Sequence, residues 1–209
     1  MYLLNQIKKV KSLADAGLVY NQENYDAERY EELRQLALEM MALVGDTSVE
    51  KLTDFFIPET DYPTPKVDVR GIVVNEKMEL LMVKEQVDGA WTLPGGWADI
   101  GMTPAEVVVK EMREESGLEV RPERLCAIFD KRCYDHPPQA HYVYKIFFHC
   151  EVINGDFDPN FDIQDVGYFG IENLPTLSAD RITKHQIKKI YAHLISGNID
   201  ALLMKLNSL

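Results

Sequence analysis

Positive charge is scarce in this chain. Its 209 residues include 22 lysines and arginines against 34 aspartates and glutamates, so the formal net charge is −12. This deficit argues against long duplex nucleic acid as a partner, because binding to it depends on a basic surface. A small polyanionic substrate is compatible with the deficit if a metal ion or local basic side chains offset the repulsion.

Cysteines and long apolar runs are also scarce. The three cysteines, Cys126, Cys133 and Cys150, have no metal-binding spacing, and their odd number argues against a disulfide framework. No apolar run is long enough to span a bilayer. The first residues lack the apolar core and the cleavage site of a signal peptide. We therefore expect a cytoplasmic protein without a membrane partner.

The chain divides at a segment with three prolines between residues 57 and 65, which cannot continue a helix and predict a linker. Before it, apolar residues repeat at helical spacing. They predict one helix ending at Gly17, a second from Asn24 to Gly45 and a third from Ser48 to Phe56. We expect residues 1–62 to form a small helical module and its linker. The tyrosines and methionines of the second helix are expected in its core, but their number and the small size of the module also favour a homodimer contact.

From residue 63 to residue 209 the pattern changes. Strands are predicted at 67–74, 78–83, 125–133, 141–153 and 166–169, the first two as a hairpin. Helices are predicted at 104–116, 181–195 and 199–206. Because strands both precede and follow the first of these helices, we expect an α+β domain with a mixed sheet flanked by helices.

The helix over 104–116 has well-defined ends. Thr103 and Glu106 form a capping box around Pro104, and Gly117 is a typical stop. These signals fix the register of the residues between them.

That register places Glu111, Glu114 and Glu115 at positions i, i+3 and i+4, on one face of the helix. Such an acidic run is, taken alone, more often a solvated helix face. Its position after the glycine turn at Gly95 and Gly96 favours a hard cation instead. Mg²⁺ is bound by carboxylates, waters and phosphate oxygens.

These residues resemble the signature of the Nudix hydrolases, G-x5-E-x7-R-E-U-x-E-E-x-G-U, in which U is bulky and aliphatic. Gly96 matches the first glycine, and residues 111–118 match the second half. Two positions depart from the signature. Met102 replaces a glutamate, and Lys110 replaces the arginine that, in the family, helps to orient the following glutamate. Lysine keeps the charge but lacks the planar guanidinium fork.

The N-terminal part resembles the helical extension of a bacterial Nudix subgroup that includes ADP-ribose and CDP-choline pyrophosphatases. The resemblance implies an α/β/α sandwich with a mixed β-sheet, preceded by a small all-helical domain. It also implies a cofactor, Mg²⁺ with Mn²⁺ as a substitute. The implied reaction splits the pyrophosphate bond of a nucleoside diphosphate linked to another moiety, giving two phosphomonoesters.

The resemblance assigns catalytic and metal-binding roles to Glu111, Glu114 and Glu115, and places the backbone of Gly96 at the metal. Asp162 and Asp165, before a late strand, are additional acid–base candidates, although a solvated loop is an alternative for both. Further candidates are expected to contact the substrate: Arg70 for a phosphate, Trp97 and Tyr168 for a stacked base, and Glu85. Arg70 has an alternative role as an ion-pair partner of Asp68 or Glu85.

Two other functions remain open from the sequence. Met102 and Lys110 are compatible with a non-catalytic nucleotide sensor on the same scaffold. An RNA-end-trimming nuclease would use the same metal chemistry, but the acidic surface disfavours it.

Overall fold

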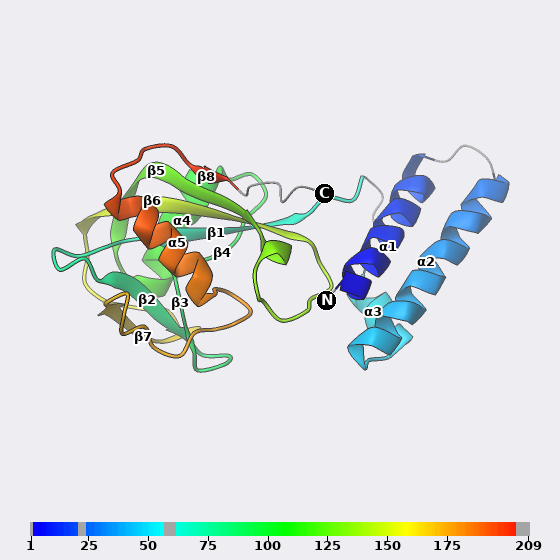
Figure 1. Cartoon of the computed structure of the whole chain (residues 1–209), viewed down its shortest axis with the longest axis horizontal. Coiled ribbons are helices and arrows are strands. Elements are labelled where there is room, and N and C mark those ends of the chain that lie inside the picture. Colours follow the sequence, from blue (N-terminus) through cyan, green and yellow to red (C-terminus); the bar gives the residue numbers. More distant parts are fainter. Residues whose placement is uncertain (1, 21–23, 57–61, 204–209) are drawn as a thin grey trace. The chain divides into compact units, whose positions relative to one another are not determined.

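A computed structural model describes residues 2–20, 24–56 and 62–203. It separates the chain into two compact units, and Figure 1 shows their elements. The helical unit comprises residues 1–65 together with 138–141, and the second unit comprises residues 66–137 and 142–209. None of the helices in the described residues is long and apolar enough to cross a membrane.

The helical unit contains α1 (Tyr2–Tyr20), α2 (Asn24–Gly45) and α3 (Val49–Phe55). Its core is formed by Ile7, Ala37 and Met41. The three predicted helices are confirmed, but the prediction that the first ends at Gly17 is wrong. A Cβ on Gly17 would lie 2.5 Å from the ring of Tyr30, so glycine is needed there for close contact between α1 and α2.

The second unit contains two β-sheets. The strands of the larger sheet follow the order β4-β1-β6-β5-β8, and those of the smaller sheet the order β3-β2-β7. The larger sheet is mixed, since β1 is antiparallel to β4 and parallel to β6. The bounds are β1 (Lys66–Ile72), β2 (Leu80–Glu85), β3 (Trp91–Thr92), β4 (Gly95–Trp97), α4 (Pro104–Ser116), β5 (Glu119–Asp130), a 3₁₀ turn (Lys131–Cys133), β6 (Val143–Asn154), β7 (Ile163–Phe169), α5 (Lys184–Ile195) and β8 (Leu202–Leu203).

Two predictions for this unit are wrong. The first is the extent of the hairpin between the strands predicted at 67–74 and 78–83. The two segments pair next to the turn, where Val74 bridges Leu80 and the Leu81 N–H donates to the Val73 carbonyl at 2.9 Å, but β1 and β2 belong to different sheets. Both edges of β1 are taken by β4 and β6. The helix predicted at 199–206 is absent over its described residues, where Leu202 and Leu203 pair with β5 as β8; residues 204–206 lie outside the described part.

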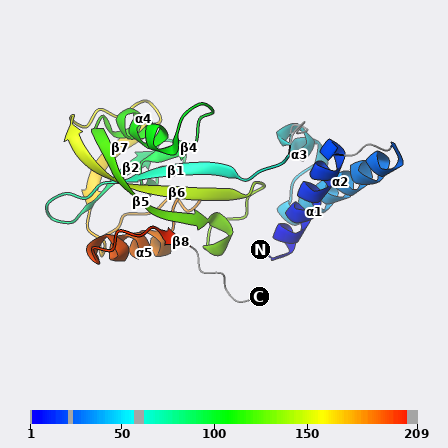
Figure 2. The same ribbon diagram turned by 90° about the horizontal axis from the view of Figure 1, so that it is seen from above.

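Helices α4 and α5 cover opposite faces of the larger sheet (Figure 2). The core under α4 includes Val69, Val108 and Met112, and the core under α5 includes Ile72 and Ile187. Val69 and Ile72 therefore lie on opposite faces of β1, Val69 toward α4 and Ile72 toward α5. A Cβ on Gly71 would lie 2.6 Å from the Met112 sulfur, so this glycine allows α4 to pack closely on β1.

Candidate active site

The predicted helix ends are confirmed. The backbone N–H of Thr103 donates to the Glu106 carboxylate at 2.7 Å, and the Glu106 N–H donates to the Thr103 hydroxyl at 3.3 Å. Gly117 has φ 79°, a left-handed conformation that glycine adopts without strain. The register of α4 is therefore fixed at both ends, and the glutamates lie at the spacing that the sequence predicts.

Glu115 is held at the glycine turn. The N–H of Gly95 donates to its Oε2 at 2.8 Å. Burial raises the pKa of Glu115 to about 8, although the positive charge of Arg70 and the Gly95 hydrogen bond oppose the shift. A carboxylate that protein surrounds in this way is ionised at neutral pH only if further positive charge is supplied.

Glu111 lies against the same turn. A Cβ on Gly96 would come within 2.9 Å of the Glu111 Oε2 atom. Burial raises the pKa of Glu111; Lys110 opposes the shift and the negative charge of Glu114 adds to it. The turn therefore brings the oxygens of Glu111 and Glu115 to two successive glycines.

Glu114 is more exposed, and its nearest cation is Lys110. The ammonium nitrogen of Lys110 lies 3.7 Å from Glu114 and 3.9 Å from Glu111, and it donates to Asp99 at 2.8 Å. Lys110, which departs from the family signature, thus still contacts the glutamate that follows it. Met102, the other departure, packs against the core under α4.

The donor chemistry at the turn fits a hard cation. Glu111 and Glu115 are two partly buried carboxylates, and the negative charge of Glu111 adds to the raised pKa of Glu115. A cation would relieve that cost of ionisation. Among the described residues, no three His, Cys, Asp or Glu side chains form a ready metal cluster. Mg²⁺ does not require one, because it keeps several waters and takes one or two carboxylates together with substrate phosphates.

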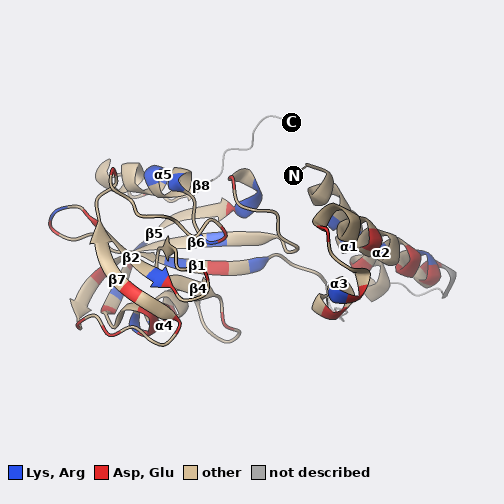
Figure 3. Ribbon diagram, turned by 90° about the horizontal axis from the view of Figure 1, so that it is seen from below, with Lys and Arg blue, Asp and Glu red and all other residues tan. Residues whose placement is uncertain are grey.

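Arg70 is buried rather than presented to solvent. Its Nε and Nη2 donate to the two carboxylate oxygens of Asp68 at 3.0 and 2.8 Å. Its Nη1 donates to the Leu93 carbonyl at 3.0 Å. Lys145, on the neighbouring strand, donates to Asp68 at 2.5 Å. Figure 3 shows charged residues of both signs on the paired strands β1 and β6. The ion-pair alternative is therefore observed for Arg70, and a phosphate contact stays a prediction.

The other predicted substrate contacts lie on three strands, and Glu85 is near enough to Arg70 and Glu115 to interact with both electrostatically. Glu85, on β2, is buried and pairs with Arg181 at 2.7 Å. Trp97, on β4 beside the glycine turn, is 53% exposed and so has a free ring surface. Tyr168, on β7, is partly buried and packs on Phe157, with ring centroids 5.9 Å apart. Of these side chains, Trp97 is the best placed to stack on a base.

Asp162 and Asp165 are exposed at the start of β7. Asp165 accepts a hydrogen bond from Val166 N–H at 2.9 Å, and it lies opposite Lys84 in the sheet. The preceding loop is tied to α4, because the N–H of Asn160 donates to the Glu114 carbonyl at 2.9 Å. This tie keeps the acidic loop near the end of the glutamate helix, but no contact joins either aspartate to Glu111, Glu114 or Glu115.

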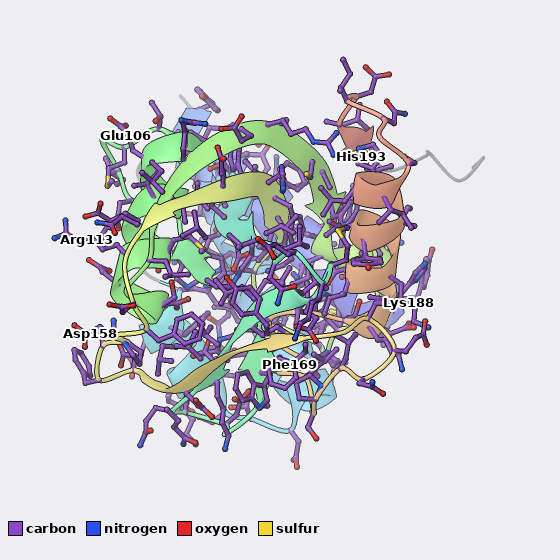
Figure 4. All side chains as sticks on the ribbon, turned by 90° about the vertical axis from the view of Figure 1, so that its left-hand side faces the viewer. Glu106, Arg113, Asp158, Phe169, Lys188 and His193 are labelled. Atoms are coloured by element: carbon purple, nitrogen blue, oxygen red, sulfur yellow. The ribbon has the colours of Figure 1, made fainter. Side chains whose placement is uncertain are left out.

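A pocket of about 840 Å³ lies along α4. Its wall is apolar at Val109 and Pro122, and both departures from the signature, Met102 and Lys110, line it. Glu114 lies at the same pocket. Three further lining residues, Glu106, Arg113 and Asp158, stand at one edge of the domain, with Arg113 extending away from α4 (Figure 4).

Residues 64–194 match the family model of the NUDIX domain. The chain belongs to the Nudix family. Residues 2–56 match a second model, described as the UDP-X-like, N-terminal oligomerisation domain. The fold expected from the sequence, a Nudix sandwich with a mixed sheet behind an N-terminal helical region, is confirmed.

Similar proteins share nearly the whole chain. YjhB of Bacillus subtilis (strain 168), named provisionally as an ADP-ribose pyrophosphatase, is 42% identical over 90% of both chains. A crystal structure of a UDP-X diphosphatase is 33% identical and covers 96% of this chain and 97% of its own, with a TM-score of 0.64. An ADP-ribose pyrophosphatase from Streptococcus suis 89-1591 is 35% identical and covers 67% of this chain and 98% of its own, with a TM-score of 0.58.

These likenesses support the enzyme prediction: the chain is a Nudix hydrolase of the pyrophosphatase type. Asp68 was predicted only as a partner for Arg70, and Lys145 was not among the predicted site residues. A signal for Lys145 was available, because this lysine interrupts the apolar strand 143–148 at a position that alternation places toward the core. A lysine there needs a buried anion as its partner.

Proposed function

We propose that the Nudix domain is a metal-dependent hydrolase of a nucleoside diphosphate linked to a second moiety, of the ADP-ribose or CDP-choline type. The products are two phosphomonoesters. The observation that carries the proposal is the pair of partly buried carboxylates at the turn, with Glu115 fixed by the Gly95 N–H at 2.8 Å. The relatives named for ADP-ribose and UDP-X act on this class of linkage, which supports the same chemistry here.

Glu114 and Glu115 would hold Mg²⁺ or Mn²⁺, and Glu111 would either join them or accept a proton from the attacking water. When bound, the ion neutralises non-bridging phosphate oxygens and lowers the pKa of a bound water. Because Gly95 and Gly96 have no side chains, their backbone gives phosphate oxygens close access to the carboxylates. The leaving group is itself a phosphate, so charge stabilisation contributes more than protonation.

Trp97 would stack on the base of the nucleotide, because its exposed ring stands on the strand that carries the glycine turn. Arg70 would act on the phosphates from within the protein through its charge. Tyr168, Glu85, Asp162 and Asp165 are the next residues to test for effects on substrate choice.

We also propose that the helical unit forms a homodimer. Leu36, Met40, Leu43 and Val44 are exposed on α2 at spacings of four, three and one. That spacing gathers them into one stripe along the helix. An exposed apolar stripe is typical of an interface between subunits, and the match to an oligomerisation domain supports the same function.

A substrate panel with Mg²⁺ and Mn²⁺ tests the proposed reaction. ADP-ribose, CDP-choline and UDP-linked sugars are incubated with wild type, Glu114→Gln and Glu119→Gln, and phosphomonoester release is measured. Glu114→Gln should lower turnover by about 10²-fold or more while folding is kept, since one metal-binding carboxylate is lost. Glu119→Gln, an exposed glutamate just beyond α4, serves as the control and should keep wild-type turnover.

EDTA should abolish wild-type turnover, and added Mg²⁺ should restore it. Turnover that persists in EDTA would overturn the metal assignment. A folded protein that binds these nucleotides and releases no phosphomonoester with either metal would overturn the enzymatic proposal.

A further inference from the structure

A buried series of contacts connects β6 to the glutamate helix. It begins at Lys145, whose ammonium donates to Asp68 Oδ1 at 2.5 Å. These residues face each other in the register of the parallel strands β1 and β6. Asp68 in turn receives two donors of Arg70, and the remaining Arg70 nitrogen, Nη1, donates to the Leu93 carbonyl at 3.0 Å. The carbonyl that Arg70 holds lies two residues before Gly95.

The segment from Leu93 to Gly95 is held tightly against β1. The N–H of Gly71 donates to the Pro94 carbonyl at 2.9 Å. Gly95 faces Arg70 in the antiparallel register, and its φ of 138° is a conformation that other residues rarely adopt. A Cβ on Gly95 would lie 2.7 Å from the Arg70 Cα, so only glycine allows the turn to approach β1 this closely. The Gly95 N–H then reaches Glu115.

The negative charge of Asp68 also attracts both Arg70 and Lys145. Asp68, Arg70 and Lys145 are 5%, 4% and 1% exposed and together carry one positive charge in excess. Burial alone would raise the pKa of Asp68, but Arg70 and Lys145 hold it well below its usual value. Arg70 also attracts the Glu115 carboxylate, although burial still keeps the pKa of Glu115 raised. Buried ion pairs of this kind add little net stability compared with apolar residues of similar volume, so a geometric role is a better account of this one.

We infer that Asp68 and Lys145 are positioning residues for Glu115. Lys145 orients the Asp68 carboxylate, Asp68 fixes the Arg70 guanidinium, and Arg70 fixes the carbonyl of Leu93 and with it the turn whose N–H holds the Glu115 carboxylate. Neither residue touches the substrate. The inference rests on the proposed function for its catalytic consequence, but the positional effect on the turn is independent of any substrate.

Lys145→Met is the test, because methionine keeps most of the volume and removes the donor. Amide hydrogen exchange at Gly95 should become at least about 10-fold faster, since the hydrogen bond to Glu115 is no longer held in place. The kcat should fall about 10- to 100-fold with KM changed less than about 2-fold, because a small misplacement of a catalytic group affects the chemical step.

Gln186→Met is the matched control. Gln186 is fully buried on α5, away from the glycine turn. Its side-chain oxygen accepts a hydrogen bond from the Thr183 N–H and lies 3.0 Å from His136 Nε2. This variant should leave the Gly95 exchange rate and kcat within about 2-fold of wild type, even if its melting temperature falls. Equal changes in both variants would mean that Lys145 acts only through general stability, and would overturn the inference.

Asp68→Asn provides a second route if Lys145→Met does not fold. Asparagine keeps one acceptor oxygen for Arg70 or Lys145 but loses the second, so amide exchange at Gly95 should again become faster. A folded variant at either position with wild-type Gly95 exchange would overturn the inference. If wild type shows no turnover on any nucleotide, the proposed function fails, whereas the Gly95 exchange rates still decide the positional role.

Discussion

Glu111 and Gly96 are in contact at the turn: a Cβ on Gly96 would lie 2.9 Å from Glu111 Oε2 and 3.0 Å from its Cδ. No side chain larger than hydrogen fits there while Glu111 keeps its position. The first glycine of the Nudix signature therefore has a steric function in this chain, in addition to any backbone contact with metal or phosphate.

Gly96→Ala should consequently displace the Glu111 carboxylate. We expect kcat to fall by about 10-fold or more, because the group that holds metal or accepts the proton is moved, while the melting temperature changes little. Gly170→Ala is the control, since a Cβ there meets no atom within 4 Å. Steady-state kinetics and thermal melts of both variants make the comparison. Unchanged kcat in Gly96→Ala would show that Glu111 tolerates the displacement.

Glu115→Gln should stabilise the metal-free protein in a pH-dependent way. The pKa of Glu115 is raised from 4.5 to about 8 in the folded state, so between these values the folded protein retains a proton that the unfolded chain has released. Wild-type stability therefore falls as pH rises through this interval. Glutamine does not ionise, so the variant avoids that loss of stability. Each kcal/mol added to the free energy of unfolding raises the melting temperature by about 2–4 °C in a domain of this size.

Thermal melts in EDTA at pH 5 and pH 8 measure this effect. The advantage of Glu115→Gln over wild type should be larger at pH 8. Added Mg²⁺ should stabilise wild type more than the variant, because the variant has lost a ligand. An advantage that is the same at both pH values would contradict the raised pKa.

Lys110 offers a test of the departure from the signature. Lys110→Ala removes the cation that contacts Glu111 and Glu114 at 3.9 and 3.7 Å, so the two carboxylates lose charge compensation. We expect the Mg²⁺ concentration for half-maximal activity to change several-fold and kcat to fall. Lys110→Arg restores the residue typical of the family and should keep or raise kcat, since guanidinium can hold a carboxylate by two hydrogen bonds. Activity titrated against Mg²⁺ compares the three proteins.

Leu43→Asp tests the proposed homodimer. Leu43 is 84% exposed within the apolar stripe of α2, and a carboxylate there would be buried unpaired in an interface. Light scattering should show the mass halved relative to wild type. Val87→Asp changes a residue that is 75% exposed in a turn of the Nudix domain and should leave the mass unchanged. A monomeric wild type would refute the dimer.

Local signals in the sequence were sufficient to predict the ends and the register of α4. The capping box at Thr103 and the stop at Gly117 depend only on neighbouring residues, and they fix which face carries Glu111, Glu114 and Glu115. The pairing of the strands, by contrast, depends on residues that are far apart in the sequence. Residues 67–74 and 78–83 read as a full hairpin because a short turn joins them. They pair next to that turn, at Val74 and Leu80, but the β1 edges are occupied by β4 and β6. Competition between distant strands decided that pairing, and no short stretch of sequence records it.

The sequence by itself determined the Nudix signature, the register of the glutamate helix and the division of the chain at its prolines, because each depends on spacing along the chain. Only the tertiary structure decided that Arg70 is buried on Asp68, that Lys145 completes this pair, and that Gly95 donates to Glu115. These contacts join residues up to 77 positions apart. They form because parallel pairing of β1 with β6 aligns Asp68 with Lys145, and antiparallel pairing with β4 aligns Arg70 with Gly95.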